Sequence, residues 1–486
     1  MHADITRDTF DPARHFSRVL MQQGRVPLDA DLNEQSSILL HYLRTLAADL
    51  LGPYAGPREN LGFRVAYTPQ NGGTLELAAG RYYVHGLLCE IERPQSVPVA
   101  SAGPWPGGPD RVEAERQRAG QQPLQPPFLV YLEVWERLVT AYHQPLLRET
   151  ALGGPDTAAR AQVAWRIRVA RLPGAERGWP LCEGAWASVS EQLARGAERG
   201  GLRVRAGGAQ TDTLDPCVLP PDARYRGMEN QLYRVEVHTA GQLGGGWDHL
   251  EQVENTDVEF RWPRPGGPGA PTFKWSRENG SVIFAIRSLQ GVEVEVETLG
   301  LDARLDLAPG DWVEILDDLS DGPGVLARVA DVDREGLRVT LEDTRGDYPE
   351  YDESHAGIHP LLRRWDQSDP VVVRGEGGGH AARGTLRDGA VQAVDGWIEL
   401  ESGISVRFET GRTYLPGDHW LIPARVATGD VEWPREEDGT GPATVPARRT
   451  ERFYAPLAVV LGENDITDCR RCIGELTAVC GMQEAG

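Results

Sequence analysis

The first regular pattern of apolar positions lies over residues 29–51. Apolar residues there recur in alternating steps of four and three, and one serine fills the only gap. This heptad spacing is typical of a helix that packs against other helices rather than against a broad core. Asp29 can cap the helix, and Gly52-Pro53 can end it. The seam consists of Leu32, Ser36, Leu39, Leu43, Leu46 and Leu50.

Two interpretations of this seam are open. It can pack on the chain's own β domain, or it can associate with the same helix of other copies. Three heptads are marginal when isolated, so self-association needs further contacts. We therefore take the six seam residues as candidate oligomerisation residues.

After Pro53 the pattern changes to short β-prone runs separated by Gly, Pro or Asn. Asn71-Gly72-Gly73 is a strong hairpin signal, and residues 101–127, rich in Pro, Gly and Gln, predict a long exposed loop. We expect a last β region over 397–460, and before it strands at Phe63–Tyr67, Thr74–Leu77, Arg81–Glu92, Phe128–Val139, Val163–Leu172, Gln231–Thr239, Thr272–Trp275, Val282–Ile286, Val292–Thr298, Trp312–Leu316 and Leu337–Leu341.

One short motif occurs twice. Leu307-Ala308-Pro309-Gly310-Asp311 precedes the expected strand Trp312–Leu316, and Leu415-Pro416-Gly417-Asp418 precedes another aromatic-bearing segment. Pro-Gly favours a type II turn, which here leads into a strand. No fixed period connects the copies, so the motif does not indicate a solenoid or a propeller.

These patterns predict a mainly β, multi-domain protein with one long N-terminal α-helix and long Gly/Pro-rich loops. Gly and Pro together make up 91 of 486 residues, about 19%, whereas their usual share is roughly 12%. We expect an N-terminal strand–turn–helix assembly segment over 1–55, β domains over 56–225 and 226–350, and a third β region with a Cys-containing tail over 351–486.

The net charge of −22 argues against nucleic acid as a partner, because a duplex binder needs a basic footprint. We expect no membrane span, since no apolar stretch approaches about 20 residues. The first residues lack the apolar core of a signal peptide. Six cysteines favour a reducing compartment with free thiols. We therefore expect the chain to be made in the cytoplasm.

Candidate chemistry is sparse. Cys469, Cys472 and Cys480 give three possible metal ligands, but a structural zinc site usually needs four, so we expect ordinary free cysteines. No serine-hydrolase elbow or phosphate-binding loop occurs. We expect no catalytic residues, cofactor or metal. Thirteen tryptophans keep carbohydrate binding open, although buried core is the favoured interpretation for Trp247, Trp262, Trp275, Trp365 and Trp397.

Several sequence blocks carry a resemblance to a known family. They resemble a bacterial family of unassigned domain function that is encoded among the genes of phage-tail-like contractile injection systems. The blocks extend over nearly the whole chain and are Arg7–Pro12, Ser17–Val26, Asp29–Gln35, Tyr131–Arg137, Ala151–Thr157, Glu229–Glu236, Phe273–Ser281 and Trp420–Arg425.

The N-terminal block is more loosely similar to the first segment of phage baseplate and tail-fibre proteins. There a strand, a Gly-Arg turn and a helix precede a β domain with a strand like Gly80–Gly86. The resemblance implies a non-enzymatic structural subunit, a homotrimer at or near the baseplate or tail fibre, assembled with other tail subunits into a particle. The alternative is a tail-associated protein that binds or degrades surface carbohydrate.

Overall fold

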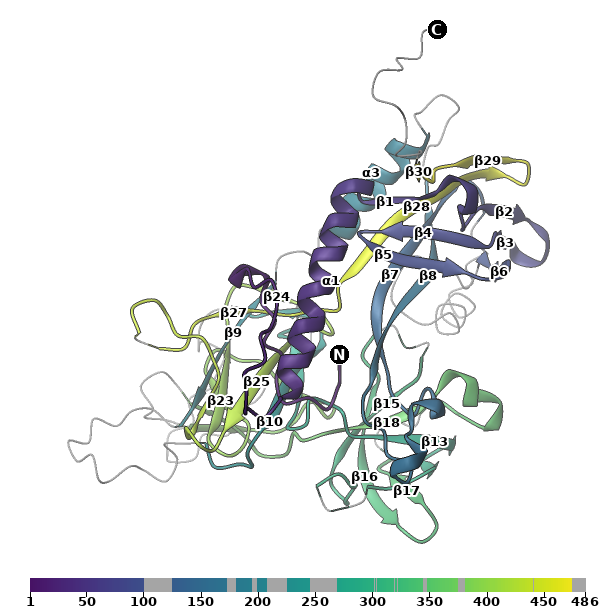
Figure 1. Cartoon of the computed structure of the whole chain (residues 1–486). Helices are drawn as coiled ribbons and strands as arrows, with labels where there is room; N and C mark the ends of the chain where they lie inside the picture. The colour runs from purple at the N-terminus through teal and green to yellow at the C-terminus, as the bar shows by residue number, and fades with distance from the viewer. Residues whose placement is uncertain are drawn as a thin grey trace, which may run out of the picture. The chain divides into compact units, whose positions relative to one another are not determined.

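The structure is a computed structural model of the chain (Figure 1). It describes residues 1–99, 125–172, 181–194, 199–207, 225–244, 269–300, 302, 304–318, 320, 322–343, 348–374, 381–439 and 441–473. The expected mainly β, multi-domain fold is confirmed. Most of the expected exposed loop over 101–127, and Cys480 in the tail, lie outside the described residues.

The chain forms two compact units, each built from three separated segments. Unit 1 comprises Met1–Asp8, Val139–Ala159 and Ala197–Arg449; unit 2 comprises Thr9–Leu138, Arg160–Gly196 and Thr450–Gly486. We expected contiguous regions along the chain. The units are instead discontinuous, because strands far apart in sequence pair with each other.

Unit 2 holds α1 (Asp29–Leu51), α3 (Leu181–Ala194) and three small sheets. One sheet has the order β30-β1-β4-β5, the second β2-β3-β6 and the third β29-β28-β7-β8. The strands are β1 (Tyr54–Pro57), β2 (Val65–Thr68), β3 (Thr74–Leu77), β4 (Gly80–Val84), β5 (Leu87–Ile91), β6 (Gln95–Pro98), β7 (Phe128–Val139), β8 (Arg160–Arg171), β28 (Arg452–Gly462), β29 (Asp465–Asp468) and β30 (Cys472–Ile473).

Strand β7 separates two hydrophobic cores of unit 2. Its side chains alternate between the two faces of the sheet, as strand geometry requires. Phe128 and Val130 enter the larger core with the small sheets, whereas Leu129 and Tyr131 enter a second core beneath α3. β28 pairs with β7 in antiparallel register and contributes to both cores. Because both faces of β7 are buried, its sequence is an almost uninterrupted apolar run.

Helix α3 was not among the predicted elements. Its buried residues Ala185 and Val189 are four positions apart and pack in the second core of unit 2. At its start, Cys182 forms a disulfide with Cys469. The expectation of free thiols is therefore wrong for Cys469, whereas Cys472 is free and exposed.

Unit 1 contains a closed barrel of order β13-β14-β17-β16-β15-β18 with its own hydrophobic core. Two larger sheets, β21-β12-β10-β25-β26 and β20-β19-β22-β23-β9-β27, enclose another core, and β11 pairs with β24. The barrel strands are β13 (Ile283–Gln290), β14 (Glu293–Val296), β15 (Trp312–Leu316), β16 (Val325–Asp333), β17 (Arg338–Leu341) and β18 (Leu361–Trp365).

The remaining strands of unit 1 form the two larger sheets and the short β11–β24 pair. They are β9 (Gly201–Ala206), β10 (Gln231–Thr239), β11 (Gly241–Gln242), β12 (Thr272–Ser276), β19 (Val371–Arg374), β20 (Ala381–Gly384), β21 (Val391–Gln392), β22 (Trp397–Glu399), β23 (Ile404–Phe408), β24 (Thr413–Tyr414), β25 (His419–Arg425), β26 (Asp430–Val431) and β27 (Val445–Pro446).

The predicted N-terminal helix is confirmed as α1, with Gly52 after its last residue at a φ of +75°. Its start differs in detail: Leu28 is the cap residue, and Asp29 is the first residue of the helix. The hairpin at Asn71-Gly72-Gly73 is confirmed by the pairing of β2 with β3. The expected run Arg81–Glu92 forms two strands, β4 and β5, which pair with each other. No helix among the described residues is long and apolar enough to cross a membrane.

Candidate functional site

The seam of α1 lies on the surface of the protein. Its five leucines are between 53% and 68% exposed, and Ser36 is exposed as well. The helix instead buries Ala30 and Ile38. No described part of the chain covers the seam, which does not support the interpretation that it packs on the chain's own β domain.

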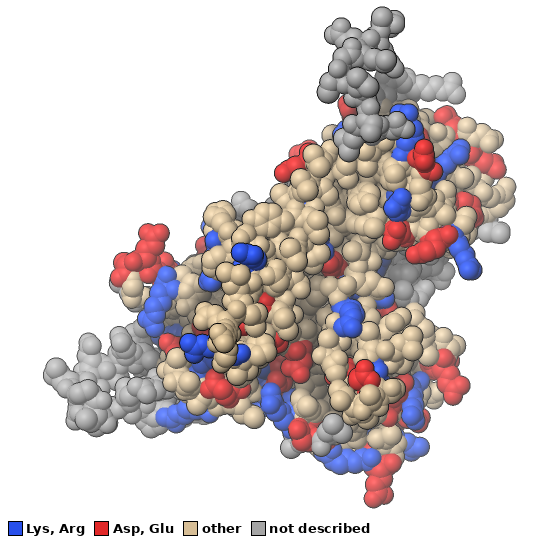
Figure 2. Space-filling model, viewed as in Figure 1, with Lys and Arg blue, Asp and Glu red and all other residues tan. Residues whose placement is uncertain are grey.

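The positions that flank the seam carry little charge. In the heptad frame the flanking residues are Asn33, Gln35, Leu40, Tyr42, Ala47 and Asp49. Leu40 and Tyr42 are exposed and widen the apolar face. The surface over α1 is correspondingly mostly uncharged in Figure 2. Copies of this face would meet with one acid per helix at its flanks, so charge repulsion between them is small.

The segment before α1 also carries exposed apolar side chains. Thr9 Oγ1 donates a hydrogen bond to Glu34 Oε2 at 2.8 Å, and the backbone N–H of Val19 donates to Gln35 Oε1 at 2.9 Å. Five large apolar side chains between residues 16 and 28 are 44% to 79% exposed. They are Phe16, Leu20, Met21, Val26 and Leu28.

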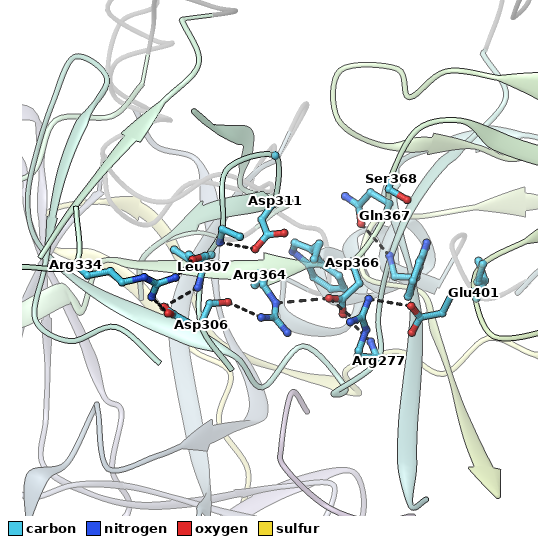
Figure 3. Close-up of a pocket in the computed structure, with 15 residues that line it drawn as sticks. Arg277, Asp306, Leu307, Asp311, Arg334, Arg364, Asp366, Gln367, Ser368 and Glu401 are labelled. Carbon is cyan, nitrogen blue, oxygen red and sulfur yellow. Dashed lines mark hydrogen bonds and ion pairs between the residues drawn. The ribbon is translucent and has the colours of Figure 1, made fainter. Parts of the chain in front are cut away.

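A second candidate site is a polar pocket of about 320 Å³ in unit 1 (Figure 3). One side of the pocket is formed by the end of β18 and the turn before β15. The other side is formed by the end of β12, in the β21-β12-β10-β25-β26 sheet, and by the turn before β23. Three arginines and four acids contribute to its lining, together with apolar residues. These charged residues are Arg277, Asp306, Asp311, Arg334, Arg364, Asp366 and Glu401.

Arg277 and Arg364 hydrogen-bond to residues of the pocket wall. Arg277 donates to Glu401 Oε2 at 2.9 Å, and its backbone N–H donates to Asp366 Oδ2 at 2.8 Å. Arg364 is buried, and its Nη1 and Nη2 donate to the carbonyl oxygens of Asp306 and Arg304 at 2.5 and 2.6 Å. These residues come from β18 and the residue after it, from the residue after β12 and from the connections before β15 and β23.

Asp311 belongs to the first copy of the recurrent turn. Its Oδ2 accepts the N–H of Ala308 at 2.9 Å, and in the second copy Asp418 Oδ2 accepts the N–H of Leu415 at the same distance. The two copies differ at the other carboxylate oxygen. Asp418 Oδ1 accepts a hydrogen bond from Arg449 at 2.7 Å, whereas Asp311 Oδ1 accepts none from the described residues and lies in the pocket wall.

Two pocket acids have shifted acidity. Burial raises the pKa of Asp311 above its ordinary value, even though its hydrogen bond with Ala308 lowers it. Burial also raises the pKa of Glu401, against the nearby charge of Arg277. Both side chains therefore hold a proton more readily than a free carboxylate does.

Beside the pocket, β10 and β12 bury both of their faces, one apolar and one rich in charged side chains. Lys274 of β12 pairs with Glu314 of β15 and lies 3.4 Å from Glu236 of β10. Its Nζ also lies 4.5 Å from the ring centre of Trp365. The Lys274–Glu314 ion pair ties the sheet to the barrel.

The pocket was missed from the sequence because its acids and arginines come from distant strand ends. Its one sequence signal was the recurrent Pro-Gly-Asp turn. Trp275, Trp365 and Trp397 are buried, which confirms the core interpretation for them, while Trp247 and Trp262 lie outside the described residues. In the described part of the chain, no three His, Cys, Asp or Glu residues are placed to hold a metal ion.

Comparison with known proteins assigns the chain to one family. A family of unknown function, DUF6519, matches residues 1–179 and 181–486, so the chain belongs to this family. No curated protein and no solved structure matches the chain.

Proposed function

We propose that the chain is a non-enzymatic structural subunit that self-associates through α1, within a phage-tail-like contractile injection particle. The exposed seam of α1 is the observation that supports this proposal most directly. Exposed apolar surface of this extent is costly to leave in water and marks interaction sites. The particle itself is suggested by the resemblance of the sequence blocks.

A second copy of the same helix is the occupant that fits the seam best. The alternating steps of four and three place leucines where knobs-into-holes packing needs them. The leucines at both core positions lack the β-branched pattern that favours two strands, and Leu40 and Tyr42 broaden the face. The trimeric state is suggested by the looser resemblance of the N-terminal block to phage baseplate and tail-fibre proteins. The apolar segment Phe16–Leu28 supplies the further contacts that three heptads need.

Assembly into a particle is tested in the native bacterium. Sheathed particles are purified, and their composition is measured by mass spectrometry in strains that carry the normal chain or the double variant Leu39→Asp, Leu43→Asp. We expect the chain in the particles at a fixed ratio to the sheath protein, and its loss from them in the variant.

The matched control is Leu146→Asp, Leu152→Asp, which changes two exposed leucines of unit 1 that are 91% and 66% exposed. This variant is expected to enter particles normally. Absence of the normal chain from purified particles would overturn the particle assignment. Equal incorporation of the Leu39, Leu43 variant would overturn the role of α1 in assembly.

A further inference from the structure

We propose that the pocket of unit 1 binds a neutral, polyhydroxylated ligand of the size of one or two sugar rings. This inference is independent of the self-association of α1. It assigns a ligand class to the pocket in Figure 3, on the basis of its size, its wall and two acceptor side chains.

The dimensions and wall of the pocket suit a small polar ligand. A volume of about 320 Å³ lies at the lower end of the usual range for small-molecule sites. Leu307, Ala308 and Leu400 give the wall an apolar strip beside the charged side chains. A sugar ring presents both C–H faces and hydroxyl edges, so it matches a wall of this mixed kind.

The balance of charges selects against other ligand classes. Four carboxylates would repel an anion, and three guanidinium groups would repel a cation. An apolar ligand would remove these groups from water without giving them hydrogen bonds, which is costly. A hydroxyl group both donates and accepts hydrogen bonds, so a polyol can donate to the carboxylates and accept from the arginines at the same time.

Two side chains retain acceptor capacity toward the pocket. Asp311 Oδ1 accepts no hydrogen bond from the described residues, although the equivalent oxygen of Asp418 is taken by Arg449. Each oxygen of Glu401 accepts one hydrogen bond, from Tyr233 and from Arg277, and a carboxylate oxygen can accept two. Ligand hydroxyls are the donors that these positions lack.

One donor in the pocket is also unsatisfied. Arg277 Nε is buried and has no hydrogen-bond acceptor among the residues that the structure describes, and Asp366 Oδ1, the oxygen with which it forms an ion pair, lies 3.6 Å away. A buried donor without an acceptor carries a free-energy cost that a bound ligand oxygen would remove. The pocket thus offers acceptors and a donor on the same wall.

The test is saturation-transfer NMR with the full-length chain and a panel of glucose, galactose, mannose and N-acetylglucosamine, followed by calorimetry on any sugar that binds. Inorganic phosphate is the anionic probe. We expect at least one sugar to bind and phosphate not to bind. Asp311→Asn and Glu401→Gln are each expected to weaken sugar binding by about tenfold or more, the usual effect of losing a charge-assisted hydrogen bond.

Matched controls are Asp331→Asn and Glu353→Gln, which change exposed acids of the same unit and should leave the affinity unchanged. Ala308→Trp is a second variant that fills the pocket from an exposed position without touching a buried charge. It should abolish binding at an unchanged melting temperature. The proposal is overturned if no sugar binds, if phosphate binds instead, or if Ala308→Trp binds as well as the normal chain.

Discussion

At the scale of single residues, Lys274 is the only lysine of the chain and is almost completely buried. Its ammonium group contacts two carboxylates and lies over an indole ring. Burial alone would raise the pKa of Glu236, but Arg234 and Lys274 outweigh burial and hold it well below the usual value. The acids of this cluster therefore stay charged inside the protein.

Lys274→Met should destabilise unit 1 strongly, because it leaves Glu236 and Glu314 buried without the ammonium group. Breaking a buried ion pair on one side costs about 3–5 kcal/mol. Urea unfolding measures the free energy. The control Arg435→Met removes an exposed ion pair with Asp430 and should cost less than about 1 kcal/mol. Equal small losses in both variants would show that Lys274 does not hold the cluster together.

His419 gives unit 1 a pH dependence. Burial, followed by the nearby charge of Arg234, lowers the pKa of His419 to about 2. In the unfolded chain the pKa is about 6.5, so below that pH only the unfolded state takes up the proton. Stability from this group is complete above about pH 6.5 and is lost as the pH falls.

We expect the melting temperature to fall between pH 7 and pH 5, with His419 accounting for about 2 kcal/mol at pH 5. The partly exposed His2, whose pKa is also lowered by desolvation, acts in the same direction. In His419→Asn the amide can replace the Nδ1–H that donates to the Gly417 carbonyl, and it does not titrate. The variant should lose less stability on acidification. An identical pH profile would contradict the role of His419.

At the scale of elements, the Cys182–Cys469 disulfide joins α3 to the segment after β29. The two cysteines are 287 residues apart, so the bond restricts the unfolded chain over a long loop. Cys182→Ser, Cys469→Ser should lower the free energy of unfolding of unit 2 by about 2–5 kcal/mol. Cys472→Ser, at the free exposed cysteine, is the control. Equal stability of the two variants under oxidising conditions would refute the disulfide's contribution.

The elements predicted correctly from the sequence are those with an uninterrupted apolar pattern between turn residues. The bounds of β7, β10 and β15 agree with the predicted runs, because each strand combines an apolar pattern with turn residues at its ends. Helix α3 was missed although Leu181, Ala185, Val189 and Leu193 repeat every four residues, since alanine is a weak apolar marker. The disulfide was missed because pairing between distant cysteines leaves no local signal.

The two candidate sites also differ in how far the sequence could predict them. Spacing alone placed the six seam residues on one face of a helix, because a helix converts sequence spacing into a stripe. That face is exposed, and its role in oligomerisation stays a prediction. The pocket was not found, because its side chains come from separate strand ends and turns. The recurrent turn drew attention to Asp311 and Asp418. Only the structure shows that Arg449 engages one of these acids and that the other faces a pocket.

At the scale of the whole molecule, the net charge of −22 opposes the association of identical chains. Salt screens this repulsion, whereas the apolar contact of the seam does not weaken with salt. We therefore expect the oligomer to persist or become tighter between 50 mM and 500 mM NaCl, as measured by sedimentation velocity at a series of concentrations. Dissociation by salt would show that ion pairs, and not the seam, hold the copies together.

We propose that copies of this chain associate through the exposed seam of α1, and light scattering of the purified full-length chain measures this association. We expect a mass three times the 53.3 kDa of one chain, reduced to 53.3 kDa in the variant Leu39→Asp, Leu43→Asp and unchanged in Leu146→Asp, Leu152→Asp. A mass of 53.3 kDa for the normal chain at all concentrations, or an oligomer that the Leu39, Leu43 variant retains, would contradict it.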